Sequence, residues 1–249
     1  MKRFWIALQF LTILPIKIKS EIAEEEYARS LLYFPVVGML IGSVLAGTTL
    51  LSGFLPNLVV GVLIIITSVF ITGGIHLDGF ADTCDGFYGP RSKEQILEIM
   101  RDSRVGTMGA VGIFCLLFLK FTLIVSIPRE ILWKLLIVMA VFARWSQVLA
   151  CSTSDYARRE GKARCFMEHD SRKELLAGSL FTAALSFAWM KLAGGILLVV
   201  SLLPVLLFIT YIKRKIGGMT GDTIGAVSEI AEVAVLFFGL VFWGKQCFT

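Results

Sequence analysis

The sequence has little charge for its length. Only 17% of its 249 residues are charged, against about 25% in a soluble domain, and 56% are hydrophobic. This composition excludes a soluble globular domain and a disordered chain. The five cysteines form no paired C-x-x-C spacing, so neither a disulfide framework nor a structural zinc site is expected. No small-residue cleavage site follows the first apolar stretch, which argues against a cleaved signal peptide.

The apolar residues instead form runs close to 20 residues long. An α-helix needs about this length to cross a hydrocarbon core of about 30 Å. We therefore expect an all-α, polytopic membrane protein with one catalytic domain over residues 1–249 and about seven transmembrane helices. Residues 4–16 are apolar but too few to span, and we expect them to lie in the membrane interface or to re-enter it. The predicted spans are 30–51, 55–75, 108–127, 131–150, 175–190, 192–212 and 226–243.

The basic residues predict the orientation. When the segments between spans are assigned alternately, 18 of the 24 lysines and arginines fall on one side and three on the other. The positive-inside rule then places the N-terminus and the three long loops in the cytoplasm and the C-terminus outside, in the cell (inner) membrane. The net charge of +5 is thereby explained without a nucleic-acid partner.

Three carboxylates follow the second predicted span. Asp78, Asp82 and Asp85 stand at i, i+4 and i+7, which puts them on one face if that span continues as a helix. Carboxylates on one face repel each other unless a cation neutralises them. Mg²⁺ does so and keeps coordination positions open for substrate phosphates. The alternative is a solvated acidic face paired with Arg101 and Arg104.

A glycine-rich stretch precedes the last predicted span. Gly218 and Gly221 lie beside Asp222, where backbone N–H groups at a helix N-terminus form an anion site. Plain turns are the alternative. Asp222 also brings a further carboxylate to the cytoplasmic edge of the bilayer, which makes it a candidate metal ligand.

Other ionisable side chains fall within or next to predicted spans. Glu229 and Glu232 lie one helical turn apart inside the last span, where an ionised side chain is costly and marks a functional site. They could instead pair with Arg144 in the fourth span. Lys120 is expected to reach the interface or to pair within the bundle. His76 precedes the carboxylates and is a candidate general base, an orienting residue, or a helix-terminus hydrogen-bonding group.

Carboxylates, a divalent metal and several arginines at a membrane interface indicate transfer of a phosphoryl or diphosphate-linked group. Six stretches of the sequence also carry a family resemblance: GGIHLDGFADTCDGFYG (73–89), EIMRDSRVGTMGA (98–110), GGMTGDTIGAVSEIAE (217–232), ALQFLTILP (7–15), YFPVVGMLIG (33–42) and DYARREG (155–161). With them the sequence resembles cobalamin synthase, also called adenosylcobinamide-GDP ribazoletransferase, over nearly the whole chain. Cys84, Phe80 and Phe87 depart from the family pattern, and none of them is a proposed ligand.

The resemblance implies the last step of cobalamin nucleotide-loop assembly. Adenosylcobinamide-GDP and α-ribazole, or its 5′-phosphate, would give adenosylcobalamin, or its 5′-phosphate, and GMP, with Mg²⁺. Expected partners are these corrinoid-GDP and α-ribazole substrates and the lipid bilayer, and the chain is compatible with a homo-oligomer. From the chemistry we assign metal binding to Asp78, Asp82, Asp85 and Asp222, catalysis to His76, Arg104, Arg158, Glu229 and Glu232, and cofactor binding to Arg101, Arg144, Gly218 and Gly221.

Two other classes remain open from the residues alone: a membrane enzyme of another kind, with two examples, and a cation transporter. A CDP-alcohol phosphotransferase expects a D-G-x-x-A-R run, but here Asp82 follows Ala81 in place of Arg. An intramembrane prenyltransferase expects a second aspartate-rich motif in a later loop, where this chain has one Asp and two Glu. A cation transporter would place its carboxylates near the midplane of the membrane and distribute them over several helices.

Overall fold

The computed structural model describes residues 1–18, 22–161 and 163–244. Lys19, Lys162 and Lys245, which belong to the basic residues counted above, and the C-terminal tail predicted to lie outside, fall beyond these residues. The described part contains ten α-helices and no strand, apart from a single bridge between Tyr156 and Met219. The helices are α1 Lys2–Leu11, α2 Glu24–Ser30, α3 Phe34–Thr48, α4 Asn57–Thr72, α5 Ile75–Phe87, α6 Lys93–Ile99, α7 Thr107–Ser126, α8 Arg129–Ser152, α9 Arg172–Ile216 and α10 Gly221–Trp243.

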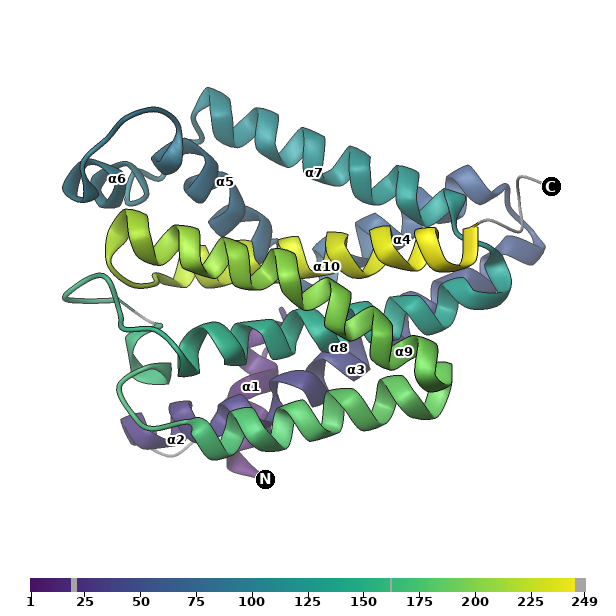
Figure 1. Ribbon diagram of the computed structural model, residues 1–249, viewed down its shortest axis with the longest axis horizontal. Coiled ribbons are helices and arrows are strands. Elements are labelled where there is room, and N and C mark those ends of the chain that lie inside the picture. Colours follow the sequence, from purple (N-terminus) through teal and green to yellow (C-terminus); the bar gives the residue numbers. More distant parts are fainter. Residues whose placement is uncertain (19–21, 162, 245–249) are drawn as a thin grey trace.

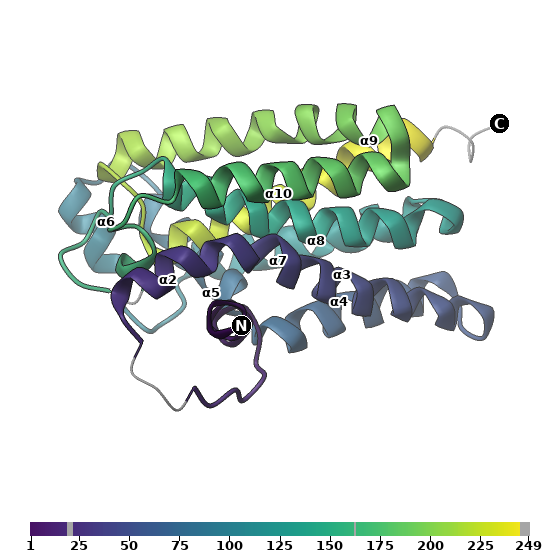
Figure 2. The same cartoon turned by 90° about the horizontal axis from the view of Figure 1, so that it is seen from below.

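The long helices confirm a polytopic membrane protein. Five helical segments are long and apolar enough to cross a membrane, and the bent pair α4–α5 makes a sixth if it is counted as one. One of the five, α9, has 45 residues and is broken at Lys191, whose φ of 54° is not helical. Its two halves run antiparallel beside each other (Figures 1 and 2). Counting each half as a span gives seven, in agreement with the sequence. The five segments are Glu24–Gly53, Thr107–Ser126, Arg129–Ser152, Arg172–Ile216 and Gly221–Trp243.

Helix α8 forms the centre of the bundle. Every residue from 135 to 148 is buried. Helix α3 packs closely on it, because a Cβ at Gly38 would lie 3.0 Å from the Val141 Cα, and one at Gly42 would lie 2.6 Å from the Ile137 Cα. The G-x-x-x-G spacing therefore marks a helix-packing face.

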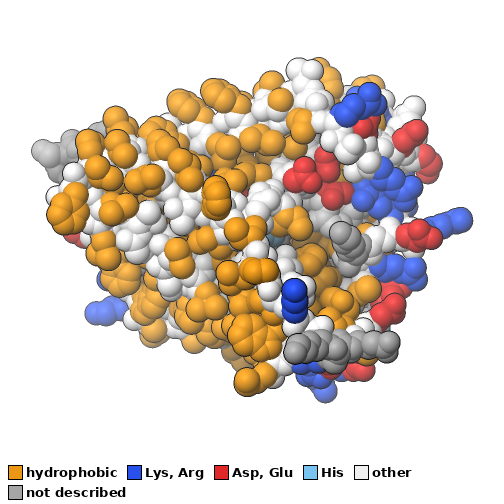
Figure 3. Space-filling view, turned by 180° about the vertical axis from the view of Figure 1, so that it is seen from behind, with side chains coloured by type: hydrophobic (Ala, Val, Ile, Leu, Met, Phe, Trp, Pro, Cys, Tyr) orange, Lys and Arg blue, Asp and Glu red, His pale blue; other side chains and the backbone are white. Residues whose placement is uncertain are grey.

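The predicted motif loops gather at one end of the bundle. Helices α5 and α6, the segment between α8 and α9, and the turn before α10 lie together at the left of Figure 1. The break at Lys191 lies at the opposite end. Figure 3, seen from behind, shows charged side chains concentrated at the loop end and apolar side chains over the rest of that face. The loops that carry the motifs therefore share one side, as the distribution of basic residues predicts.

The second span does not continue into the carboxylate helix, so the prediction of one continuous helix is wrong. Gly73 and Gly74 both adopt left-handed conformations, with φ of 62° and 69°, and α5 turns from α4 by 92°. Glycine pays no Cβ penalty there, which explains why the helix breaks at this pair. We take α4 as the spanning segment and α5 as a separate helix at the loop end.

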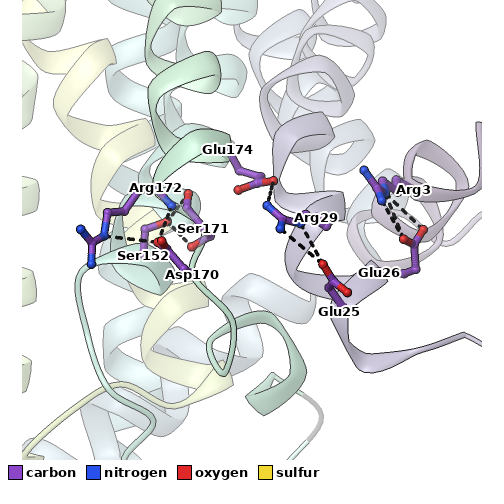
Figure 4. A network of polar contacts seen from close by, with 9 residues as sticks. All are labelled: Arg3, Glu25, Glu26, Arg29, Ser152, Asp170, Ser171, Arg172 and Glu174. Carbon is purple, nitrogen blue, oxygen red and sulfur yellow. Dashed lines mark hydrogen bonds and ion pairs between the residues drawn. The ribbon is translucent and has the colours of Figure 1, made fainter.

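The N-terminal segment is held against the bundle by ion pairs. Helix α1 has ten residues, too few to span, as predicted. Arg3 of α1 pairs with Glu26 of α2 at 2.8 Å, and Arg29 of α2 pairs with Glu174 of α9 at 3.0 Å (Figure 4). These contacts connect the first two helices to the start of α9, close to the loop end.

Candidate functional site

The site begins where α5 lies against the first turns of α10. A Cβ at Gly79 would lie 2.6 Å from the carbonyl oxygen of Asp222, so only glycine permits this approach. A turn further along α10, Gly225 faces the backbone of His76. A Cβ added at Gly225 would lie 3.2 Å from the His76 Cα. The contact brings Asp78 and Asp82 of α5 beside Asp222 of α10, although about 140 residues separate them in the sequence.

These carboxylates carry more negative charge than their surroundings balance. Asp222 pairs with Arg158 at 3.0 Å, and the same guanidinium donates to the Met100 carbonyl at 3.3 Å. Partial burial and the neighbouring Asp222 and Asp78 raise the pKa of Asp82 to about 7. When all three carboxylates are ionised, one guanidinium leaves two negative charges unbalanced, which a divalent cation would neutralise. Without such a cation, the raised pKa means that Asp82 takes up a proton near neutral pH.

Asp85 makes a different set of contacts. Its two carboxylate oxygens accept hydrogen bonds from the backbone N–H groups of Gly106 and Gly109, each at 2.8 Å. It thereby caps the N-terminus of α7, and its negative charge interacts favourably with the positive end of the helix dipole. Of the three predicted α5 ligands, Asp85 is thus the one already engaged by backbone donors.

The described residues contain no group of three His, Cys, Asp or Glu side chains arranged to hold a metal ion. Mg²⁺ does not require such a cage, because it commonly binds through one or two carboxylates, several waters and substrate phosphates. The oxygen ligands and the charge excess of Asp78, Asp82 and Asp222 fit this mode of binding.

The glycine-rich turn is held by the loop that carries Arg158. The Met219 N–H donates to the Asp155 carbonyl at 2.9 Å, and the Ala157 N–H donates to the Met219 carbonyl at 2.8 Å. Gly218 packs directly on the Asp155 carbonyl, so close approach explains this glycine. Gly221 begins α10, whose N-terminus is capped by Thr220. Anion binding by Gly218 and Gly221 stays a prediction.

The deeper glutamates belong to a buried ion-pair cluster. Lys120 of α7 contacts both Glu229 and Glu232, the latter at 2.7 Å. Arg144 of α8 donates to Ser228 at 2.6 Å and pairs with Glu232 at 3.4 Å. Two cations therefore balance two anions. The sequence offered pairing with Arg144 as an alternative to a functional role for the glutamates. Lys120, the other partner, could be recognised as a lysine within an apolar run. A catalytic role for the glutamates stays a prediction.

His76 is buried on the side of α5 that faces the bundle. Burial, together with Arg144 and Lys120, lowers the pKa of His76 well below its usual value, so the imidazole is neutral. It lines a small cavity of about 30 Å³ with Gln147 of α8. The His76 Nδ1 and the Gln147 Oε1 have no hydrogen-bond partner among the described residues. Gln147 was not singled out from the sequence, because a lone amide in an apolar run has no characteristic spacing.

The two arginines that follow α6 lie at the surface. Arg104 pairs with Asp102 at 2.7 Å and is 87% exposed, so the structure does not bring it into the Asp78–Asp82–Asp222 group. Arg101 is also exposed and acts electrostatically on the Tyr156 hydroxyl. The structure thus joins Arg158 directly to the candidate site and leaves Arg101 and Arg104 at its margin.

Comparisons with known proteins identify the family of this chain. Residues 3–240 match the family model described as cobalamin-5-phosphate synthase. The chain is similar to proteins named adenosylcobinamide-GDP ribazoletransferase from Alkaliphilus metalliredigens, at 40% identity over 100% of this chain and 98% of the relative, and from Clostridium acetobutylicum, at 37% over 95% and 98%. No solved structure matches it. The family model and the relatives span nearly the whole chain, and the chain therefore belongs to the cobalamin-5-phosphate synthase family.

Proposed function

We propose that this membrane transferase joins adenosylcobinamide-GDP and α-ribazole, or its 5′-phosphate, and releases GMP. A ribose hydroxyl of the ribazole attacks the phosphorus nearest the corrinoid, the bond from that phosphorus to the bridging oxygen breaks, and GMP leaves with the bond's electron pair. The hydroxyl proton passes to a base. The observation that carries the proposal is the charge excess of Asp78, Asp82 and Asp222 in a chain of this family.

The acidic group accounts for the divalent metal that a diphosphate substrate requires. One or two of the carboxylates of Asp78, Asp82 and Asp222 would hold Mg²⁺, which when bound would supply positive charge to the diphosphate. Asp85 supports this group from one helical turn away by fixing α7 against α5. The ligands thus come from two helices whose separation is set by the backbone contact at Gly79.

Arg158 has two tasks in this mechanism. Its ion pair orients the Asp222 carboxylate, and its buried position keeps positive charge beside the phosphates as negative charge develops on the leaving oxygen. The contact with the Met100 carbonyl ties it to the end of α6. Both contacts are made by the Nη2 nitrogen, which carries a hydrogen for each.

We further propose that the site faces the cytoplasm and that the chain lies in the cell (inner) membrane. The support is the distribution of basic residues together with the clustering of the motif loops at one end. The test uses single-cysteine variants in intact cells. A membrane-impermeant thiol reagent is expected to label a Phe54→Cys variant at the opposite end and to leave Cys165 unlabelled. Labelling of Cys165 from outside contradicts the orientation.

The activity test is an assay of purified protein for GMP release. Release is expected to require both the corrinoid-GDP and α-ribazole, and to stop when EDTA removes divalent cations. GMP release without α-ribazole indicates a hydrolase. Transfer to a different alcohol acceptor in place of α-ribazole indicates another class of phosphotransferase. Either result contradicts the proposed reaction.

A further inference from the structure

A cleft of about 650 Å³ opens beside the candidate site, between the end of α5, the segment after α6 and the N-terminus of α7. Asp85 forms part of its wall, and Asp85 follows Asp82 by one helical turn. The cleft therefore begins one helical turn along α5 from Asp82. Its chemistry comes from four further side chains: Tyr88, Arg91, Asp102 and Arg104.

The side chains of the cleft differ from those of the acidic group. Arg91 donates to the Asp85 and Gly86 carbonyls, which holds its guanidinium at the C-terminal end of α5. Tyr88 is the first residue after α5, and 57% of its surface is exposed. Two arginines supply positive charge for phosphate oxygens, and an exposed tyrosine ring offers a face on which a nucleobase can stack.

Asp102 adds an acceptor pair. Its carboxylate accepts hydrogen bonds from the Arg104 backbone N–H at 3.0 Å and from Nε and Nη2 of the Arg104 guanidinium at 3.0 and 2.7 Å. The arginine side chain is 87% exposed, so a ligand can reach the carboxylate and displace the guanidinium. Guanine presents two adjacent donors, N1–H and the 2-amino group, which match the two oxygens of a carboxylate. Adenine presents a donor beside an acceptor and does not match.

We propose that this cleft binds the guanosine monophosphate part of the corrinoid-GDP substrate and holds it as the leaving group. Tyr88 stacks on the base, Asp102 accepts from the guanine edge, and Arg91 and Arg104 contact phosphate oxygens. This inference rests on the proposed function, since it names where one half of the substrate lies. The acidic group of Asp78, Asp82 and Asp222 then meets the diphosphate at the inner end of the cleft.

The chain provides its own control for Asp102. The tripeptide Asp-Ser-Arg occurs at 102–104 and again at 170–172. In the second copy Arg172 also donates its backbone N–H to Asp170, at 3.1 Å, and its side chain pairs with the same carboxylate at 3.3 Å (Figure 4). Both side chains are largely exposed at the start of α9. A change at Asp170 therefore reproduces the local chemistry of a change at Asp102 without the cleft.

The test measures equilibrium binding of GMP and xanthosine monophosphate to the purified full-length protein in detergent. Xanthine has a carbonyl where guanine has the 2-amino group, so an amide in place of the carboxylate favours xanthine. Asp102→Asn is expected to weaken GMP binding by at least about tenfold and to strengthen binding of the xanthine nucleotide by a similar factor. Asp170→Asn is expected to leave both affinities unchanged. A gain of binding cannot result from misfolding.

The outcomes separate this inference from the proposed function. If the wild-type protein does not bind GMP, or if Asp102→Asn and Asp170→Asn behave alike, the cleft is not the guanosine site. That result leaves ribazole transfer intact if the activity assay succeeds. If the preference switches as expected but no GMP release depends on α-ribazole, the nucleotide site stands and the proposed reaction fails. Should Asp102→Asn not fold, Tyr88→Ala serves in its place, with an expected tenfold or greater loss of GMP affinity in a folded protein.

Discussion

Helix α10 contributes acidic residues to two groups that differ in charge balance. At its N-terminus Asp222 joins Asp78 and Asp82 against one guanidinium, that of Arg158. Two turns deeper, Glu229 and Glu232 meet Lys120 and Arg144, and the charges cancel. A balanced buried group needs no further ion and explains helix packing. An unbalanced acidic group at the surface of the bundle favours binding of a cation, and such a group is therefore a candidate functional site.

The largest effect is expected from unbalancing the deep cluster. Lys120→Met leaves Glu229 and one oxygen of Glu232 without their cation in a buried position. Breaking a buried ion pair from one side costs roughly 3–5 kcal/mol. The variant is expected to melt far below the wild-type protein in detergent, which thermal unfolding followed by circular dichroism measures.

Restoring the balance separates structure from catalysis. A double variant with Lys120→Met and Glu229→Gln returns the cluster to one cation and one anion, and most of the lost stability is expected to return. A Lys120→Met protein that melts normally but has lost GMP release contradicts the structural role. It would instead support the catalytic role predicted for Glu229 and Glu232.

A smaller free-energy change, with a larger effect on activity, is expected at the unbalanced group. Asp82→Asn keeps the size of the side chain and removes one charge from the metal ligands, so the fold survives. Turnover is expected to fall by at least about a hundredfold, which corresponds to about 2.7 kcal/mol of transition-state stabilisation. Excess Mg²⁺ is expected to recover part of the rate in the GMP-release assay.

Asp170→Asn is the control for that change, since it makes the same substitution at an exposed carboxylate next to the start of α9, and its turnover is expected to equal that of the wild type. If well-expressed Asp82→Asn retains more than about a tenth of wild-type turnover at low Mg²⁺, the acidic group is not the metal site.

The smallest effect is a dependence of stability on pH in the metal-free protein. The pKa of Asp82 rises from its usual 3.8 to about 7 on folding. Between these values the folded chain binds more protons than the unfolded chain, so the stability that protonation provides is lost as pH rises through this window. The melting temperature without divalent ions is therefore expected to be lower at pH 8 than at pH 5, and Mg²⁺ is expected to raise it more at pH 8. Asp82→Asn is expected to remove the difference, and an unchanged slope in that variant would assign it to another group.

The sequence predicts the spans well because membrane crossing depends on local composition. The two apolar segments on either side of Lys191 also predict the break within α9, because a charged residue between two apolar segments favours a turn at the membrane surface. The bend at Gly73 and Gly74 was missed, because Asp78, Asp82 and Asp85 share a helix face whether or not α5 continues α4. Only the glycine pair itself signals the break.

Contacts between distant parts of the chain explain what the sequence could not show about the site. The capping of α7 by Asp85 depends on the path of the chain through α6, 21 to 24 residues further on. Lys120 meets Glu229 across 109 residues. Neither pairing follows from spacing, whereas the grouping of Asp78 with Asp222 could be predicted, because each stands next to the end of a predicted span on the same side.

The glycine pair that bends the chain also isolates the reaction centre mechanically. Spanning helices tilt when the thickness of the bilayer changes. Because α5 is joined to α4 through two residues without side chains and rests on the backbone of α10 at Gly79 and Gly225, a tilt of α4 need not be transmitted to it. The carboxylates of α5 and Asp222 then move together with α10 as one unit. The distance between them, and with it the affinity for a divalent cation, is expected to be the same in thin and thick membranes.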